Sequence, residues 1–362
     1  MWRVPLFVAS FLLIPALLLC SCGDGTKDGK GSASQPPTAQ PSDKRIVVVY
    51  TPHGDMGKDA KVAFEAKYPD IAVHLLDLGG GQILPKIRAE KARPACDIWW
   101  GGSPGDFKKA EAEGLLEPCA PAWAKHLPGG CKSPSGAWHA DFISPEVIMY
   151  NEEKLNATEV PDTWEGLLDP KWKGRIVLRD VRASATMKTI FGALIWREWK
   201  RTGDVEEGFR FLEKLQVNTG NAYAANPEDM FAKLAAPKTP YALTLWNMFD
   251  ALGRKHNHKL PFGFKIPRDT PLPCEPVAFV KGGPHPEEAN LFFDFVTAEE
   301  TLLRHAEKFF RIPARTDLAK EKLPTWMRDF KLEPLKLDWD ELDKHLEAWI
   351  LRWQTQIRSQ EQ

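Results

Sequence analysis

After residue 44 the chain alternates three times between a predicted strand and a predicted helix, and this alternation constrains its fold more than any other feature. β-branched and aromatic residues fill short apolar runs that predict strands at 45–51, 71–77 and 97–100. A loop and a helical segment follow each of them, with the helices predicted at 58–68, 82–91 and 106–113. Such alternation is typical of a mostly parallel sheet flanked by helices, in which the loops at the carboxyl ends of the strands gather at one ligand-binding edge.

A second series of elements begins after residue 151 and indicates a second domain. Further strands are predicted at 175–178, 241–245 and 277–281. Further helices are predicted at 164–168, from Ser184 onward, and at 205–215, 227–234 and 339–353. A chain of this length beyond residue 44 is long for one hydrophobic core and suits two domains. The net charge of −1 gives no general attraction to nucleic acid.

The first 21 residues carry the pattern of a secretory signal. Arg3 precedes an apolar run from Val4 to Leu19, which is shorter than the roughly 20 residues of a membrane span. The run ends in Leu-Cys-Ser-Cys at 19–22, which resembles a bacterial lipobox, so we expect cleavage before Cys22 and a lipid anchor on its sulfur. An ordinary signal peptide with two incidental cysteines is the alternative. Residues 22–44 are rich in Gly, Ser, Pro, Gln and Lys and predict a disordered tether.

Four cysteines remain beyond the expected lipid anchor, an even number that fits an oxidising compartment. They are Cys96, Cys119, Cys131 and Cys274. Three pairings are possible, and we favour Cys119 with Cys131 because the segment between them is a loop rich in Pro and Gly. The spacing contains no close pair of the kind that binds zinc.

Several linked motifs carry a family resemblance. The run DIWWGGS at 97–103, followed by EGLLEP at 113–118, resembles bacterial extracellular solute-binding proteins of ABC transporters, in their ferric-ion and small-anion-binding branch. Matching motifs continue downstream as VIMYN at 147–151, the segment from PDTWEGLLDP to GRIV at 161–177, PVAFVKG at 276–282 and RIPAR at 311–315. The motifs occur in the family's order, from about residue 45 to about residue 318.

The resemblance implies a periplasmic-binding-protein-like α/β fold with two lobes that close on a ligand. Lobe 1 is expected to hold residues 45–142 and 275–316, and lobe 2 residues 143–274, with a helical segment at 317–362 packed on lobe 2. It also implies a monomeric transport protein, held by its lipid anchor in the periplasm or at the cell surface, that passes a solute to a membrane permease with its ATPase. A membrane sensor in place of the permease is an open alternative.

Within this resemblance, the residues at the expected cleft suit a small phosphorylated or carboxylated anion. Gly80 and Gly81, with Gly102 and Ser103, put bare backbone N–H groups at two loop tips of lobe 1. From lobe 2, the helix start at Ser184, Ala185 and Thr186 offers unpaired N–H groups, and Arg182 before it can form a bidentate pair. Trp246 and Asn247, at the end of a predicted strand, are expected to line the same cleft. Taken singly, the serine is a helix cap and the glycines are turn residues.

Iron is the alternative ligand, because ferric members of the family use an adjacent pair of tyrosines, often with a histidine and a carboxylate. His53 matches the histidine position, whereas Tyr223 stands between two alanines and Gly102 occupies the carboxylate position. His53 and Tyr223 are kept as candidate ligand residues of the cleft. One His and one Tyr supply too little anionic oxygen for Fe³⁺. We therefore predict no bound metal and no cofactor, and keep ferric or chelated iron as the alternative.

A secreted serine hydrolase is the alternative from another class. Residues 101–105 match the GxSxG nucleophile elbow between a strand and a helix. The residue after the nucleophile must donate its backbone N–H to the oxyanion hole, and here that residue is Pro104, which has none. Losing one such donor costs roughly 3 kcal/mol or more of transition-state stabilisation. We therefore predict that the chain is not an enzyme.

Overall fold

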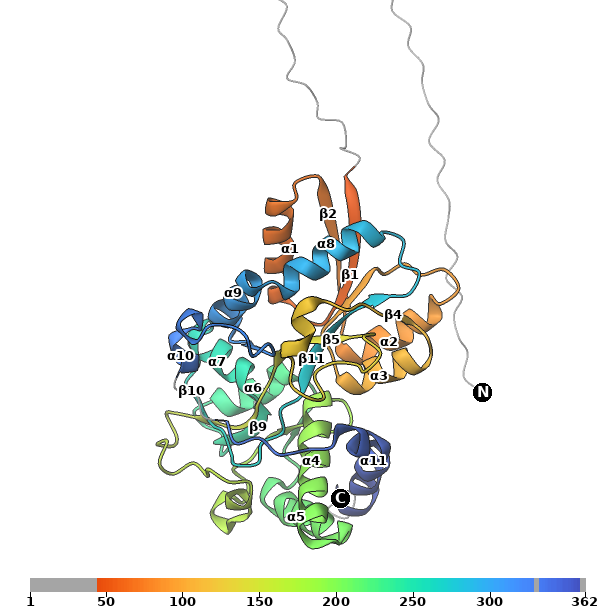
Figure 1. Ribbon diagram of the computed structural model, residues 1–362. Helices are drawn as coiled ribbons and strands as arrows, with labels where there is room; N and C mark the ends of the chain where they lie inside the picture. Colours follow the sequence, from red (N-terminus) through yellow and green to blue (C-terminus); the bar gives the residue numbers. More distant parts are fainter. Residues whose placement is uncertain (1–43, 329–331, 359–362) are drawn as a thin grey trace, which may run out of the picture. The chain divides into compact units, whose positions relative to one another are not determined.

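The structure is a computed structural model that describes residues 44–328 and 332–358 (Figure 1). The predicted signal, Cys22 and nearly all of the tether lie outside the described residues. Among the described residues, no helix is long and apolar enough to cross a membrane.

The first sheet has seven strands in the order β12-β5-β11-β3-β1-β2, with β4 paired to β11. Its strands are β1 (Arg45–Thr51), β2 (Ile71–Asp77), β3 (Ile98–Trp100), β4 (Leu116–Glu117), β5 (His139–Ile143), β11 (Cys274–Val280) and β12 (Ile312–Pro313). β1 runs parallel to β2 and β3, whereas β11 runs antiparallel to β3, β4 and β5. The predicted mostly parallel sheet is wrong here, because β11 re-enters the sheet from the other half of the molecule in the reverse direction.

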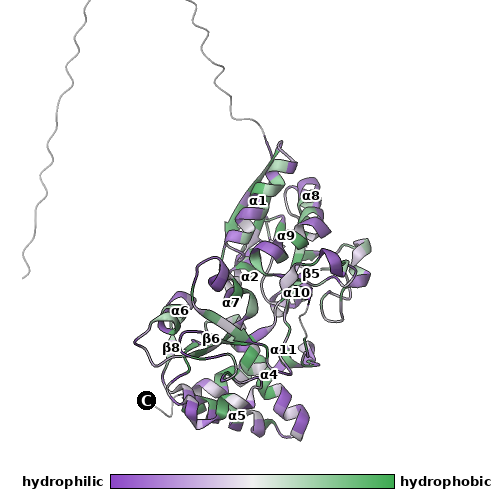
Figure 2. Ribbon diagram, turned by 90° about the vertical axis from the view of Figure 1, so that its left-hand side faces the viewer, coloured by the Kyte–Doolittle hydropathy of each residue, from purple (hydrophilic) through white to green (hydrophobic). Residues whose placement is uncertain are grey.

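Helices cover both faces of this sheet. They are α1 (Asp55–Lys67), α2 (Gly80–Ala89), α3 (Pro104–Ala112), α8 (Pro286–Thr297) and α9 (Glu299–Phe309). The alternation of β3 divides its two tryptophans between the faces: Trp99 packs in one core cluster with Phe107 of α3, and Trp100 in another with Phe292 of α8. Helices with one face on a sheet carry both hydrophilic and hydrophobic residues, as α1 does in Figure 2.

The second sheet, in the order β10-β6-β9, is wholly antiparallel, which again corrects the expectation of a mostly parallel sheet. Its strands are β6 (Glu146–Asn151), β9 (Leu243–Asn247) and β10 (Phe262–Lys265), beside a parallel pair β7 (Leu178–Arg179) and β8 (Tyr223–Ala224). Its helices are α4 (Ala185–Thr202), α5 (Val205–Thr219), α6 (Pro227–Ala235), α7 (Met248–His256), α10 (Thr325–Arg328) and α11 (Trp339–Arg352). The short helices are η1 (Ala122–His126), η2 (Glu165–Leu168), η3 (Pro170–Trp172), η4 (Lys320–Lys322) and η5 (Trp353–Ile357).

The chain passes between the two sheets at two places, from β5 to β6 and from β10 to β11. Backbone hydrogen bonds join the two passages, from Ser144 N to Pro273 O (2.9 Å) and from Glu146 N to Pro271 O (3.3 Å). We call residues 144–146 and 271–275 the hinge segments. We propose that lobe 1 holds residues 45–142 and 275–316 and that lobe 2 holds residues 143–274. The C-terminal α11 shares the core cluster of α4 and β6, through Leu342, Trp349 and Ile350.

The favoured disulfide between Cys119 and Cys131 is not formed, and the four described cysteines are free thiols. Cys119 Sγ lies 3.7 Å from His139 Nδ1. The thiol of Cys274 donates a hydrogen bond to Gly130 O (3.5 Å), and its proximity to the Cys131 thiol lowers the pKa of Cys131. The reason is that Cys131 O accepts a hydrogen bond from Ala140 N (2.9 Å) in β5, next to β11. Loop composition between two cysteines therefore pointed to the wrong partner.

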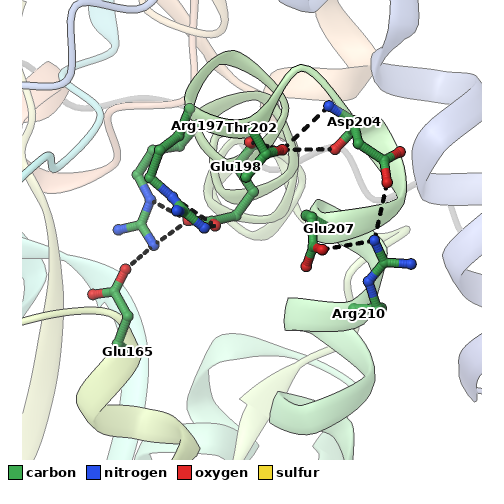
Figure 3. Close-up of polar contacts among 8 residues, drawn as sticks. Glu165, Arg197, Glu198, Thr202, Asp204, Glu207 and Arg210 are labelled. Atoms are coloured by element: carbon green, nitrogen blue, oxygen red, sulfur yellow. Dashed lines mark hydrogen bonds and ion pairs between the residues drawn. The ribbon is translucent and has the colours of Figure 1, made fainter.

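A charged network holds the start of η2 and the end of α4 (Figure 3). Arg197 and Glu198 are both buried, and the Arg197 guanidinium donates to Glu198 Oε1 (3.1 and 2.8 Å) as well as to Glu165. Arg201 donates to the other oxygen, Glu198 Oε2, at 3.1 and 2.5 Å. Glu198 thus compensates two guanidinium groups at once, one of them inside the protein.

We expect Glu198→Gln to lower the free energy of unfolding by about 3 kcal/mol, because removing one partner of a buried ion pair leaves the other charge poorly compensated. Chemical denaturation followed by circular dichroism measures this. Glu207→Gln is the matched control, since Glu207 pairs with Arg210 at the surface (Figure 3), and it should leave the free energy of unfolding nearly unchanged. Equal losses in the two variants would contradict the buried role of Glu198.

Candidate functional site

A cleft of about 1250 Å³ is lined by residues of both sheets' loops, by the hinge segments and by α11. This volume lies above the roughly 300–1,000 Å³ of ordinary ligand pockets, so the cleft has room to close around a small molecule. Ten of the twelve ligand residues predicted from the sequence lie on its wall: His53, Gly80, Gly81, Gly102, Ser103, Arg182, Ser184, Ala185, Thr186 and Asn247. The other two, Tyr223 and Trp246, do not.

Two loop tips of the first sheet form one wall of the cleft. Gly80 begins α2, and Gly102 lies in the turn between β3 and α3 with φ +120°, a conformation that favours glycine. The two tips are close, since a Cβ on Gly80 would lie 4.0 Å from Gly102 Cα. Ser103 Oγ accepts a hydrogen bond from Asp106 N (3.2 Å) and thereby caps α3, with Pro104 as the first helical residue. Ser103 is thus engaged as a helix cap, and Pro104 has no N–H to offer an oxyanion.

The start of α4 forms another part of the wall. Ser184 Oγ accepts from Met187 N (3.2 Å), so the cap is the one predicted, while the first-turn amides of Ala185 and Thr186 have no partner within the helix. This eighteen-residue helix directs the positive end of its dipole at the cleft.

Arg182 is an exposed cation on the same wall, two residues before the α4 cap. It has no ion pair or hydrogen bond to any residue that the structure describes. The other arginines and lysines on the described cleft wall are paired: Arg88 with Glu113, Lys109 with Asp106, Lys188 with Glu347, Arg254 with Glu228 and Arg311 with Glu275. Arg182 is therefore available to a ligand without breaking an existing contact.

His53 reaches the cleft wall, but its side chain is only 2% exposed. Its ring packs edge-on against Trp100, with 4.7 Å between the ring centroids, and its Nδ1 lies 3.5 Å from Glu275 Oε2. Burial, followed by the nearby Arg311, lowers the pKa of His53 well below its usual value, so the ring is neutral at pH 7. His53 is therefore mainly a packed, neutral side chain in the protein without a ligand.

Tyr223 and Trp246 belong to the core, which corrects two predicted ligand residues. Tyr223 donates its hydroxyl to Gln216 Oε1 (2.6 Å) and packs against Trp353 of the C-terminal segment. Trp246 is buried against Phe231, because alternation along β9 turns it away from the face that carries Asn247. With Tyr223 turned away, its phenolate cannot reach a ferric ion in the cleft. The described residues contain no group of three or more His, Cys, Asp or Glu side chains placed to hold a metal ion.

The sequence analysis singled out none of the acidic residues on the wall, and three of them act on one another electrostatically. Glu146 and Glu275 lie in the hinge segments, and Asp250 lies in the first turn of α7. The signal that could have found the two glutamates is that each precedes a fully apolar run, VIMY at 147–150 and PVAFV at 276–280, where an unpaired charge is out of place.

Helix α11 also borders the cleft and joins its two sides. Lys108 of α3 lies 2.7 Å from Asp340 and 3.0 Å from Asp343, both in α11. On its other side α11 packs on α4, where a Cβ on Gly192 would collide with Leu346. The sequence predicted this amphipathic helix and its packing on the second half, but not its contact with α3.

Comparison with known proteins agrees with this architecture. The family model described as bacterial extracellular solute-binding protein matches residues 97–345. A probable ABC transporter periplasmic-binding protein of Sinorhizobium fredii is 27% identical over 316 residues, covering 86% of each chain. A putative 2-aminoethylphosphonate-binding periplasmic protein of Salmonella typhimurium is 24% identical, covering 85% of this chain and 91% of the relative. Iron-bound HitA from Pseudomonas aeruginosa superposes with a TM-score of 0.71 at 20% identity, covering 85% and 98%, and shares the two-lobed fold.

Proposed function

We propose, since the chain belongs to the bacterial extracellular solute-binding protein family, that it captures a small anion between its lobes and delivers it to the permease of an ABC importer. Solute binding for import is the function that the family match and the transporter relatives establish. The anionic nature of the solute, a phosphorylated or carboxylated compound, is our proposal.

The observation that carries the proposal is Arg182, an exposed cation on the cleft wall with no partner among the described residues. It stands beside the start of α4, where the amides of Ala185 and Thr186 lack intrahelical partners. A guanidinium next to a helix N-terminus is a strong site for phosphate or carboxylate. Gly80, Gly81 and Gly102 supply backbone that a ligand can approach closely on the opposite wall.

Ferric iron is the weaker ligand, although iron-binding proteins share the fold. The chain lacks a second tyrosine beside Tyr223, and Tyr223 itself is engaged with Gln216 in the core. An anion that carries chelated iron is compatible with the same cleft. The relative described as a putative 2-aminoethylphosphonate-binding periplasmic protein favours the organic anion as the first candidate.

We further propose that the protein is a lipoprotein, anchored through Cys22 in the periplasm or at the cell surface. The lipobox-like Leu-Cys-Ser-Cys at 19–22 and the polar segment behind it support this. A tether of this length would reach roughly 25 Å root-mean-square, which suits a domain that works beside a membrane permease.

We expect Arg182→Ala to weaken anion binding about tenfold to a hundredfold, because a charge-assisted hydrogen bond contributes about 1.5–3 kcal/mol. A thermal-shift screen of phosphate, phosphonates, sugar phosphates, citrate and ferric citrate would first identify the tightest ligand. A ligand that binds only the native state raises the melting temperature, by an amount that corresponds to about 2.7 kcal/mol at a hundredfold excess over Kd. Calorimetry with that ligand then compares the variant with the wild-type protein.

Arg254→Ala is the matched control for this measurement. Arg254 also lines the cleft, but it already pairs with Glu228 and covers the ring of Phe231. It should therefore keep nearly the wild-type affinity. An unchanged affinity in Arg182→Ala would show that Arg182 does not bind the anion. A screen in which no anion raises the melting temperature would contradict the proposal that the solute is an anion.

A further inference from the structure

We propose that the hinge end of the cleft binds a positively charged organic group, so that the solute carries an ammonium as well as its anion. This inference rests on the proposed anion-binding function, which it narrows to a zwitterionic substrate class. The residues that carry it are Glu146, Glu275 and Asp250, all on the wall of the same cleft as Arg182.

Glu146 is a buried acid without a partner. The residue is 2% exposed, and its Oε2 has no hydrogen bond. Other buried polar atoms without a partner on residues of the same cleft wall include Ser144 Oγ and Arg311 Nε. Buried polar groups are nearly always satisfied, so a group of unsatisfied atoms around one cavity wall indicates a missing ligand.

The charges around Glu146 are predominantly acidic. Glu275 and Asp250 are near enough to act on it electrostatically, and both oppose its ionisation. Arg311 is committed elsewhere, since its Nη1 donates to Glu275 Oε1 (2.6 Å) and its guanidinium lies on the ring of Phe249, 3.4 Å from the centroid. His53 is neutral and adds no positive charge. An incoming cation would therefore meet two carboxyl groups, Glu146 and Asp250, that Arg311 does not neutralise.

Burial, then the carboxyl groups of Glu275 and Asp250, raises the pKa of Glu146 well above its usual value. In the empty protein Glu146 thus holds a proton, and the buried charge is avoided. An ammonium group changes this balance, because it supplies a positive charge and up to three hydrogen-bond donors. Glu146 Oε2 has no donor, whereas Asp250 Oδ2 already accepts from Trp246 Nε1 (2.7 Å) and Glu275 Oε1 from Arg311. Charged groups of opposite sign on different segments of one cleft wall also orient the solute.

Two probes that differ only in the ammonium test the inference: 2-aminoethylphosphonate and ethylphosphonate. Calorimetry on the wild-type protein should give about tenfold or more tighter binding of the amino compound, as expected of one charge-assisted contact. Glu146→Gln should abolish this preference while leaving ethylphosphonate affinity unchanged. The variant should fold normally, because glutamine reproduces the size and neutrality of the protonated acid. Circular dichroism and the melting temperature check this.

Glu228→Gln is the control, because it makes the same change at an exposed position on the cleft wall, where Glu228 pairs with Arg254. It should keep the preference for the amino compound. If ethylphosphonate binds and the ammonium adds nothing, or if the preference survives Glu146→Gln, the cation site is wrong while the anion site stands.

If neither phosphonate binds, the two proposals are separated by ethanolamine, which carries the ammonium alone. Binding of ethanolamine to the wild-type protein but not to Glu146→Gln would support the cation site without the anion site. Its failure to bind would overturn both. Binding of Ca²⁺ or Fe³⁺ that disappears in Glu146→Gln, without any response to ethanolamine, would make the site a metal site and overturn the inference.

Discussion

Gly101→Ala is expected to lower the free energy of unfolding by about 3 kcal/mol or more, through a left-handed backbone and an overfilled core acting together. Gly101 has φ +90°, and a Cβ there would lie 2.3 Å from His53 Nε2 and 2.4 Å from Cε1. The ring cannot retreat, because it is buried against Trp100 and its Nδ1 faces Glu275. The Gly101 backbone is equally fixed, since its N–H donates to Pro276 O (2.7 Å) in β11. Urea denaturation of the purified protein measures the loss.

Gly114→Ala separates the two causes. Gly114 also has a positive φ of +66°, but a Cβ there would meet nothing within 4 Å. It should therefore cost only the conformational strain, about 1 kcal/mol. In the double variant Gly101→Ala with His53→Ala, the collision is absent, so the two losses should be less than additive. Equal costs at Gly101 and Gly114, or strict additivity in the double variant, would contradict the close packing of His53 on this turn.

Local sequence patterns predicted some strands well, but they predicted the starts of the helices less accurately. β1 and β2 occur as predicted, because short, largely apolar runs with β-branched residues, bounded by turns, favour strands. The predicted starts of α1, α2 and α3 came two or three residues too late. The predicted helix starts leave Gly80 and Pro104 in loops, yet each is the first residue of its helix. At this position the missing N–H of proline costs nothing.

The sequence predicted those parts of the cleft wall that are formed by loop tips and helix starts. Glycines after a strand and a serine before an amphipathic run are local signals, and Gly102, Ser103 and Ser184 lie on the cleft wall as expected. Side chains whose direction depends on distant packing were not predictable. Tyr223 turns toward Trp353, which is far away in the sequence, and Trp246 packs against Phe231 in the core.

The place of Glu146 and Glu275 on the cleft wall could not be predicted from local sequence patterns. It depends on the contact between the two segments that connect the sheets. Glu146 and Glu275 are distant in the sequence, and only the pairing of Ser144 with Pro273 brings their segments together. The same holds for the thiols, since the strand register places Cys131 near Cys274 instead of Cys119. The neighbours of Cys131 thus depend on contacts across the first sheet, which the composition of the loop does not reveal.

The largest effect is expected at the N-terminus, where Cys22→Ala should transfer nearly all of the protein from the membrane fraction to the soluble fraction. Two acyl chains on one cysteine anchor a protein stably, because each buried CH₂ contributes roughly 0.8 kcal/mol, and no described helix offers a second anchor. Cys20→Ala is the matched control, since that cysteine lies on the side of the cleavage site that is removed and its loss should leave the protein on the membrane. Fractionation by ultracentrifugation, with mass spectrometry of the mature N-terminus, gives both results. Wild-type protein that is already soluble would show that the lipobox interpretation is wrong, and so would release by Cys20→Ala as well as by Cys22→Ala. Neither outcome would affect the solute-binding function, because the cleft lies wholly within residues 52–347.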